Sequence, residues 1–396
     1  MIKATRQHTK TLNSQLVLKL IYDRAKISRA DIARETQLTR TTVSQVVSQL
    51  MGQGLVEEVG YGESAGGKSP ILLSVVNNRY HLIGIDLASH EFRGAVVNLR
   101  GEIIRAVAFP ISGRSGEAAL TLVYKLIDTL LASSDRPVLG LGLGTPGLID
   151  TEQGIVRQAV NLDWQDLPLS QLLNARYHLP VYLVNDSQAA ALAEFIFGGW
   201  QNNRDLVVIK VDQGIGAGLV LDGQLFVGDG SSAGEIGHMM VVENDLPCRC
   251  GHTGCLETVA SAGAIIRRAQ ALARASTQSR LSLLAPEAIT LEALGAALEA
   301  NDPVARQVTA EAGLYLGRAV AALVSTLNPR QVLLIGSITT LGVPLLKIIQ
   351  QETRRQALAI LAQATKIQFG HFGLDVVILG ASAQLLTHEL GLSFAR

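Results

Sequence analysis

The 396-residue chain is poor in cysteine, in aromatic residues and in long apolar stretches. Its three cysteines, Cys248, Cys250 and Cys255, lie within eight residues, which makes a poor disulfide framework and a good metal site. No apolar run approaches the roughly 18 residues that a membrane helix needs, and the N-terminus lacks the apolar core of a signal peptide. We therefore expect a cytoplasmic protein with no membrane segment.

The chain also lacks net charge, because 34 basic residues balance 34 acidic ones. This balance hides an asymmetry, since residues 1–56 hold nine Lys or Arg against three Asp or Glu, a net charge of +6. A basic segment on a mildly acidic body indicates a localised anionic partner for that segment. Ordinary fluctuation in composition would give the same count, so charge alone does not decide the point.

What the chain does contain is glycine and a globular composition. Of its residues 48% are hydrophobic and 17% charged, and its length allows two or three domains with buried cores. The 38 glycines cluster in short loops beside apolar runs. This distribution is typical of α/β proteins that bind phosphates or small ligands.

Residues 11–52 show the pattern of three short helices. Apolar residues recur at helical spacing over residues 11–25, namely Leu12, Leu16, Val17, Leu20 and Ile21. Ser28 with Asp31 predicts the start of a second helix that ends near Thr36, and Thr39 predicts the start of a third that ends at Gly52 to Gly54. Gln37 stands at the turn position that such motifs usually give to glycine.

The third helix has the residues needed to enter the major groove of DNA, where N-terminal side chains of one helix meet base edges. Its outward-facing polar residues are Arg40, Thr41, Thr42, Ser44, Gln45 and Ser48. Residues 55–59 and 71–75 then predict a β-hairpin, with Lys68 in its glycine-rich tip placed for contact with DNA. Together they predict a winged helix-turn-helix domain, and the alternative is a three-helix cap that binds no nucleic acid.

The rest of the chain predicts two comparable β-β-β-α halves. Strands are expected over 81–87, 93–99 and 103–109, a helix over 116–132 and a strand over 138–143, and a second set of strands over 206–211, 218–221 and 224–226. Asp222-Gly223 between the last two strands is a strong hairpin signal. Two such halves indicate a two-lobed α/β body with a cleft between the lobes.

Several polar motifs fall at the ends of these elements. They are Gly-Thr-Pro-Gly-Leu-Ile-Asp at 144–150, Asn185-Asp186, Asp-Gln-Gly-Ile-Gly-Ala-Gly at 212–218, Gly-Glu-Ile-Gly-His at 234–238 and Cys-Arg-Cys-Gly-His-Thr-Gly-Cys-Leu-Glu at 248–257. In this order, over nearly the whole chain, they resemble the ROK family of repressors and sugar kinases, and the N-terminal domain resembles that of its repressor branch. The resemblance implies an actin-like (ASKHA) two-lobed sugar-kinase fold.

The cysteine motif, Cys-x-Cys-x4-Cys, is one ligand short of a tetrahedral structural zinc site. On spacing alone the fourth ligand is either His238, upstream, or His252, between the cysteines. The resemblance assigns His238, which gives His238, Cys248, Cys250 and Cys255 as the metal ligands. Four protein ligands leave no position for a catalytic water, so the zinc would be structural. The alternative is three reduced cysteines without metal.

A sugar presents neighbouring hydroxyls and needs carboxylates and amides as paired acceptors and donors. The resemblance places Asn185, Asp186, Glu235 and Glu257 around a sugar, and it gives His238 one ring nitrogen for zinc and one for a sugar hydroxyl. Taken singly, each of these acids would more often be a solvated loop residue.

The loops that hold ATP in the family's kinases are altered. Asp-Leu-Ala-Ser-His at 86–90 lacks the two glycines and the threonine of the first phosphate loop. Asp212-Gln213 replaces the usual Gly-Thr of the second, and residues 334–337 keep one glycine of a pair. We therefore expect no bound ATP or Mg²⁺ and no catalytic residue, although Asp186 matches the general base of the kinases.

The sequence thus predicts a sugar-responsive DNA-binding regulator, most simply a homodimeric or homotetrameric repressor whose operator affinity changes when a sugar or sugar phosphate binds between the lobes. The alternative is an ATP-dependent sugar kinase with a DNA-binding appendage. The expected domains are residues 1–76, a first lobe over 80–195 to which a helix at about 380–396 returns, and a second lobe over 196–379 with the zinc site and the dimerisation surface.

Overall fold

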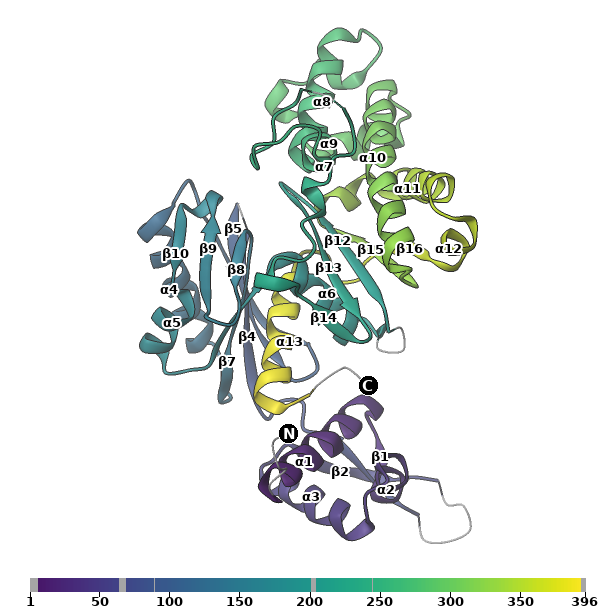
Figure 1. The fold of residues 1–396 in the computed structure, drawn as a ribbon. Helices are drawn as coiled ribbons and strands as arrows, with labels where there is room; N and C mark the ends of the chain where they lie inside the picture. Colours follow the sequence, from purple (N-terminus) through teal and green to yellow (C-terminus); the bar gives the residue numbers. More distant parts are fainter. Residues whose placement is uncertain (1–5, 64–68, 89, 201–203, 244, 393–396) are drawn as a thin grey trace.

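The computed structural model describes residues 6–63, 69–88, 90–200, 204–243 and 245–392. A small N-terminal domain of helices and short strands is followed by two larger α/β lobes that lie side by side above it (Figure 1). Within the described residues no helix is both long and apolar enough to cross a membrane. This order of parts agrees with the fold class expected from the sequence.

The N-terminal domain packs three helices against a small sheet with strand order β1-β3-β2. Its elements are α1 (Arg6–Arg24), β1 (Ile27–Ser28), α2 (Arg29–Thr36), α3 (Arg40–Gly52), β2 (Val56–Tyr61) and β3 (Ile71–Val75). Both predicted helix caps form, because Ser28 Oγ accepts a hydrogen bond from Asp31 N at 3.2 Å and Thr39 Oγ1 accepts one from Thr42 N at 3.1 Å. Gln37 ends α2 with a left-handed φ of 57°, which explains why a glycine would suit this turn.

The first helix differs from the sequence expectation in its start and in its buried face. It begins at Arg6 rather than near residue 11, and Leu12 and Leu16 of the expected apolar stripe are 50% and 46% exposed. Val17 and Ile21 of the stripe are buried as expected, together with Leu18 and Tyr22. Only the second half of α1 therefore packs against the core that α3 and β3 provide.

The two lobes contain five-stranded mixed sheets of the same topology. The strand order is β11-β7-β4-β5-β6 in the first lobe and β14-β13-β12-β15-β16 in the second. In each sheet the first strand in sequence lies in the middle, with two antiparallel strands on one side and two parallel strands on the other. The strands are β4 (His81–Leu87), β5 (Glu91–Asn98), β6 (Ile103–Pro110), β7 (Val138–Thr145) and β11 (Val181–Asn185), and β12 (Leu206–Val211), β13 (Ile215–Leu221), β14 (Gln224–Phe226), β15 (Gln331–Ile335) and β16 (Lys366–Phe369).

Helices and a small sheet complete the lobes. In the first lobe these are α4 (Gly116–Ala132), α5 (Leu169–Tyr177) and the small sheet of β8 (Leu148–Asp150), β9 (Ile155–Ala159) and β10 (Trp164–Leu167). In the second lobe they are α7 (Leu256–Ala260), α8 (Ala262–Ala275), α9 (Leu291–Glu299), α10 (Pro303–Leu327), α11 (Gly342–Gln356) and α12 (Ala359–Ala364). Alternate residues of β12 enter two different cores, as expected for a strand covered on both faces.

Two helices, α6 (Asp186–Phe197) and α13 (Val376–Leu390), lie between the sheets of the two lobes (Figure 1). Helix α6 packs on β12 and β13 of the second sheet, α13 packs on β4 and β7 of the first, and the two helices pack against each other. Glycine makes this approach possible, because a Cβ at Gly380 would lie 1.7 Å from the Ala189 oxygen and a Cβ at Gly142 would lie 2.0 Å from the Ala381 oxygen. The expected boundary at residue 195 falls inside α6.

The N-terminal domain is attached to the first lobe through α1. Tyr22 Oη donates a hydrogen bond to the Leu99 carbonyl at 2.8 Å, and Arg100 Nη1 donates one to the Tyr22 carbonyl at 2.6 Å. The Arg100 guanidinium also lies 4.2 Å from the centroid of the Tyr22 ring. Leu99 and Arg100 form the turn after β5, so this strand ends at the N-terminal domain.

Candidate functional site

A cleft of about 810 Å³ lies between the two lobes and is lined by residues of both. All five residues that the sequence assigns to a sugar line this cleft, namely Asn185, Asp186, Glu235, His238 and Glu257. They come from the start of α6, the loop after β14 and the start of α7. Segments more than 70 residues apart in the sequence therefore meet at one site.

Asn185 and Asp186 are fixed by the beginning of α6. Asn185 Oδ1 caps the helix by accepting from Ser187 N at 2.9 Å, and its amide donates to the Gly147 carbonyl at 3.2 Å. Asp186 Oδ1 also accepts from Ser187 N, at 2.7 Å. The helix N-terminus thus holds a carboxylate and an amide side by side at the cleft wall.

Glu235, His238 and Glu257 approach from the second lobe. His238 Nε2 lies 4.0 Å from Glu235 Oε2, so one ring nitrogen faces the cleft. Burial raises the pKa of Glu235, and the nearby carboxylates of Asp186 and Glu257 add to that rise. Glu257 Oε2 accepts from Ile215 N at 3.2 Å, which ties it to the loop between β12 and β13.

The three cysteines and His238 form a compact cluster whose four ligand atoms all lie within 4.8 Å of one another. His238 Nδ1 is 3.5 Å from Cys248 Sγ, and the sulfurs of Cys250 and Cys255 are 3.6 Å apart. Thiolates that share a tetrahedral zinc ion lie about 3.8 Å apart, so the spacing fits such a metal. His252 Nδ1 contacts Cys250 at 3.6 Å, but it does not belong to the four-ligand group.

Lys210, a largely buried lysine that no sequence motif indicated, also lines the cleft. Lys210 Nζ lies 2.9 Å from Asp186 Oδ2 and 2.8 Å from Asp212 Oδ2, and the Lys210 side chain is 15% exposed. The charge of Asp86 from β4 acts on the same ammonium. The signal in the sequence was a single lysine in the otherwise apolar strand Leu-Val-Val-Ile-Lys-Val.

The loops at residues 86–90 and 212–218 contact other parts of the chain. Asp212 Oδ1 accepts from Ser337 N at 2.6 Å, and Gln213 Nε2 lies 3.4 Å from His90 Nε2. Ala88 lines the cleft, whereas Ser89 lies outside the described residues. The backbone N–H of Ser337 is therefore already used by an internal carboxylate.

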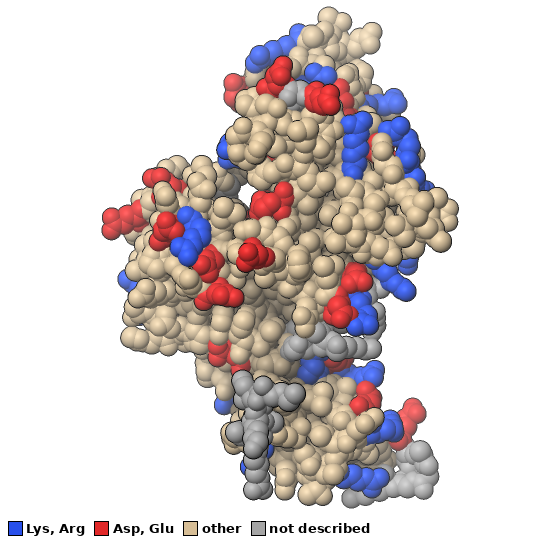
Figure 2. Space-filling model, in the orientation of Figure 1, with Lys and Arg blue, Asp and Glu red and all other residues tan. Residues whose placement is uncertain are grey.

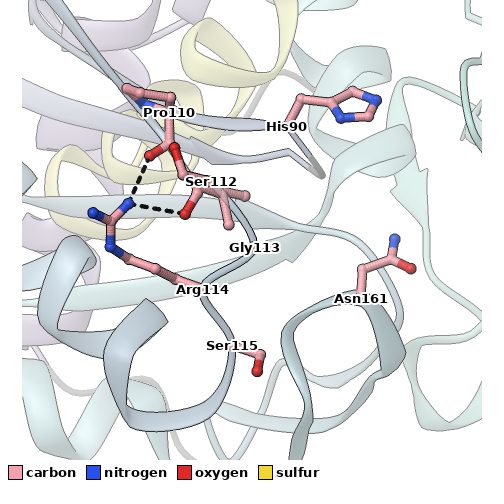
Figure 3. Close-up of a pocket in the computed structure, with 8 residues that line it drawn as sticks. His90, Pro110, Ser112, Gly113, Arg114, Ser115 and Asn161 are labelled. Atoms are coloured by element: carbon pink, nitrogen blue, oxygen red, sulfur yellow. Dashed lines mark hydrogen bonds between the residues drawn. The ribbon is translucent and has the colours of Figure 1, made fainter. Parts of the chain in front are cut away.

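A second hollow of about 430 Å³ adjoins the cleft and shares His90 and Asn161 with it. Its wall is the loop 110–115 that leads into α4. Figure 3 shows the Arg114 guanidinium turned back onto this loop, where Nη1 donates to the carbonyls of Pro110 and Ile111 at 3.2 and 2.9 Å. These two bonds hold the loop itself together.

In the N-terminal domain, five of the predicted DNA contacts on α3 are exposed, namely Arg40, Thr41, Ser44, Gln45 and Ser48. Thr42 is partly buried and bonded to the cap Thr39, and Lys68 lies outside the described residues. Four basic side chains of the domain pair with acids, in the pairs Lys19–Asp23, Arg24–Glu35, Arg29–Glu58 and Arg34–Asp31. Figure 2 accordingly shows both signs of charge side by side on the visible face of this domain.

Comparison with known proteins gives matches over both parts of the chain. A model described as the ROK family matches residues 82–388, and one described as winged helix-turn-helix DNA-binding matches residues 12–57. A xylose repressor of Caldicellulosiruptor bescii is 33% identical over 386 residues, which cover 96% of this chain and 97% of that protein.

Solved structures agree with this assignment. A ROK family transcriptional regulator described as a homologue of the Escherichia coli Mlc protein has a TM-score of 0.86 and 31% identity, with 97% of this chain and 98% of that chain covered. A ROK family glucokinase from Streptomyces griseus, solved with glucose and AMPPNP, has a TM-score of 0.70 and 27% identity, with 77% and 98% covered. The chain belongs to the ROK family and carries a winged helix-turn-helix DNA-binding domain at its N-terminus.

Proposed function

We propose that this protein is a sugar-responsive transcriptional repressor whose operator affinity changes when a sugar binds between the lobes. The observation that carries the proposal is one cleft lined by Asn185, Asp186, Glu235, His238 and Glu257 in a chain that also presents an exposed polar face on α3. Carboxylates, an amide and an imidazole in one cleft are the donors and acceptors that vicinal hydroxyls require. The xylose repressor among the relatives supports the same reading.

The proposed mechanism is a change in the angle between the lobes, which meet at α6 and α13. A sugar that contacts Asp186 of α6 and Glu235 of the second lobe at once would favour one arrangement. It shifts operator affinity only if it binds one conformation more tightly than the other. The two DNA-binding domains of a homodimer would then change their spacing, and paired half-sites on DNA would sense that change.

We further propose that the cluster of His238 and the three cysteines binds structural zinc. The metal would hold the His238 ring by Nδ1 and leave Nε2 directed at the cleft, so that it orients a sugar contact. In metal analysis, His238→Ala should lose the zinc while His252→Ala keeps it. Retention of one zinc per chain by His238→Ala would instead favour His252 as the fourth ligand.

The competing function is ATP-dependent sugar phosphorylation, which the glucokinase of the same fold makes worth testing. Phosphoryl transfer needs Mg²⁺ and backbone donors around the phosphates, whereas Ser337 N and Ile215 N already donate to Asp212 and Glu257. We expect no ADP release from ATP in the presence of sugar. If ATP is hydrolysed or transferred in a sugar-dependent way and Asp186→Asn abolishes this activity, the proposal that the protein is only a regulator is contradicted.

The direct test of the proposal is a fluorescence-anisotropy titration of DNA from the region upstream of the protein's own gene. D-xylose, D-glucose and N-acetyl-D-glucosamine would be added in turn. We expect the DNA to bind without sugar and one sugar to weaken that binding. Binding that a sugar strengthens would make the sugar a corepressor, and DNA that never binds would remove the support for the DNA-binding role.

A further inference from the structure

Lys210 lies where a strand of the second lobe reaches the floor of the cleft. Burying a lysine is unfavourable unless its ammonium is paired, and here Nζ contacts Asp186 Oδ2 at 2.9 Å and Asp212 Oδ2 at 2.8 Å. Burial alone would lower the pKa of Lys210, but the surrounding carboxylates hold it above its usual value. The ammonium is therefore a permanent positive charge at this point.

The carboxylates around it come from three separate elements. Asp86 lies near the end of β4 in the first lobe, Asp186 begins α6, and Asp212 follows β12 two residues after Lys210, on the same side of the strand. Three carboxylates without a cation would repel one another. Burial raises the pKa of Asp86 to about 7 and the charges of Asp186 and Asp212 add to the rise, while Lys210 opposes it.

The oxygens that face away from Lys210 are also engaged. Asp186 Oδ1 accepts from Ser187 N at 2.7 Å, and Asp212 Oδ1 accepts from Ser337 N at 2.6 Å. Each of these two carboxylates is thus held at one oxygen by a backbone N–H and at the other by the ammonium. In enzymes that transfer phosphoryl groups, metal ions and backbone N–H groups are turned toward the phosphates instead.

The charge that remains is still negative. The ammonium offsets one carboxylate and Asp86 is partly protonated near pH 7, but the cleft as a whole is lined by seven Asp or Glu against three Lys or Arg. A phosphate group would add further negative charge to a partly buried site of the same sign. An uncharged sugar adds none, and its hydroxyls can donate to the carboxylates.

We propose that Lys210 is a specificity-determining residue of the cleft, a built-in cation that takes the place of a divalent metal ion among Asp86, Asp186 and Asp212 and restricts the cleft to uncharged sugars. The choice of sugar as ligand rests on the proposed function. The replacement of the metal does not, because it follows from the contacts of Lys210 with Asp186 and Asp212 and from the nearby charge of Asp86.

The claim that Lys210 takes the place of a divalent metal ion is tested by adding Mn²⁺ to the full-length, zinc-loaded protein. Binding is measured as the loss of the electron paramagnetic resonance signal of free Mn²⁺. The wild type and Lys210→Arg should bind no Mn²⁺ in the cleft. Lys210→Met removes the charge and should bind one Mn²⁺ per chain at least about tenfold more tightly than any site of the wild type. Lys125→Met, on the outer helix α4, is the matched control and should behave as the wild type.

The claim that the cleft accepts only uncharged sugars is tested on the wild type alone. This test can therefore be made even if Lys210→Met fails to fold. By isothermal titration calorimetry, D-glucose or N-acetyl-D-glucosamine should bind with or without added Mg²⁺, and the matching 6-phosphate should bind at least about tenfold more weakly. Stoichiometric Mn²⁺ binding by the wild type, a folded Lys210→Met that binds none, or tighter binding of the phosphorylated sugar would each overturn the proposal. If D-xylose, D-glucose, N-acetyl-D-glucosamine and the sugar phosphates all fail to bind, the proposed function fails, and the Mn²⁺ result still decides the role of Lys210.

Discussion

Single side chains set the charge of the cleft, and Asp86 is the one whose charge changes near neutral pH. Its carboxylate is buried beside Lys210, Asp186 and Asp212, and its pKa is raised to about 7, chiefly by burial. In an unfolded chain an Asp loses its proton near pH 4. Between these values the folded state retains a proton that the unfolded state has lost.

This difference predicts that Asp86 lowers the stability of the protein as the pH rises from about 4 to about 7, because the unfolded state binds fewer protons in that window. Asp86→Asn removes the effect, and it should stabilise the protein relative to the wild type at pH 8 by on the order of 2 kcal/mol more than at pH 5. Urea unfolding of both proteins at the two pH values measures this. An equal difference at pH 5 and pH 8 would show that Asp86 does not titrate in this range.

The packing of helices depends on positions where only glycine fits. At the crossing of α13 with α6, a Cβ at Gly380 would overlap the Ala189 carbonyl, and backbone atoms cannot move aside easily. Gly380→Ala should therefore lower the free energy of unfolding by about 1–3 kcal/mol, as overpacking does. Gly52→Ala, at a helix end with open space around it, is the control and should be neutral or slightly stabilising. Thermal unfolding that is equal for the two variants would contradict the close contact.

Strand β5 connects the cleft to the DNA-binding domain. Glu91 at its start lines the cleft, and the turn at its end holds Tyr22 of α1 through Leu99 and Arg100. Arg100→Ala removes the bond to the Tyr22 carbonyl and the contact with its ring. We expect this variant to bind sugar as the wild type does but to show a several-fold smaller change in operator affinity. Calorimetry and anisotropy on the same preparation measure the two quantities, and an unchanged response would exclude this turn as a connection.

The structural features that the sequence could predict are those that depend on residues close together in the chain. Ser28 and Thr39 predicted their helices because a cap acts within three residues, and the three cysteines lie close enough in the chain to indicate a metal site by themselves. The repeated strand pattern predicted two similar lobes.

Contacts between distant segments could not be predicted in this way. No local rule pairs Lys210 with Asp186, or places Tyr22 against a turn 78 residues away. The exposed Leu12 and Leu16 show the same limit, because helical spacing finds an apolar stripe but not which part of a helix reaches the core. The closeness of α13 to α6 is likewise decided by the assembled lobes.

Across the whole chain, the proposed regulation depends on one link between two distant sites: a sugar held in the cleft changes how α3 binds DNA. The two sites share a continuous path of packed structure, since residues of α1 and of the first-lobe sheet belong to one hydrophobic core together with α6 and α13. A rigid connection of this kind allows a change in the angle between the lobes to move the DNA-binding domain.

The most direct measurement of this link is operator binding by Glu235→Gln, with and without the sugar to which the wild type responds. Glu235 lines the cleft, lies outside the four-ligand cluster and makes no capping hydrogen bond with its side chain, so the fold and the bare affinity for DNA should not change. Loss of a charged hydrogen-bond acceptor should raise the sugar concentration needed for release by about tenfold or more. Glu287→Gln, an exposed glutamate outside the residues that line the cleft, should leave the response intact. A Glu235→Gln protein that releases DNA at the same sugar concentration as the wild type would contradict the account.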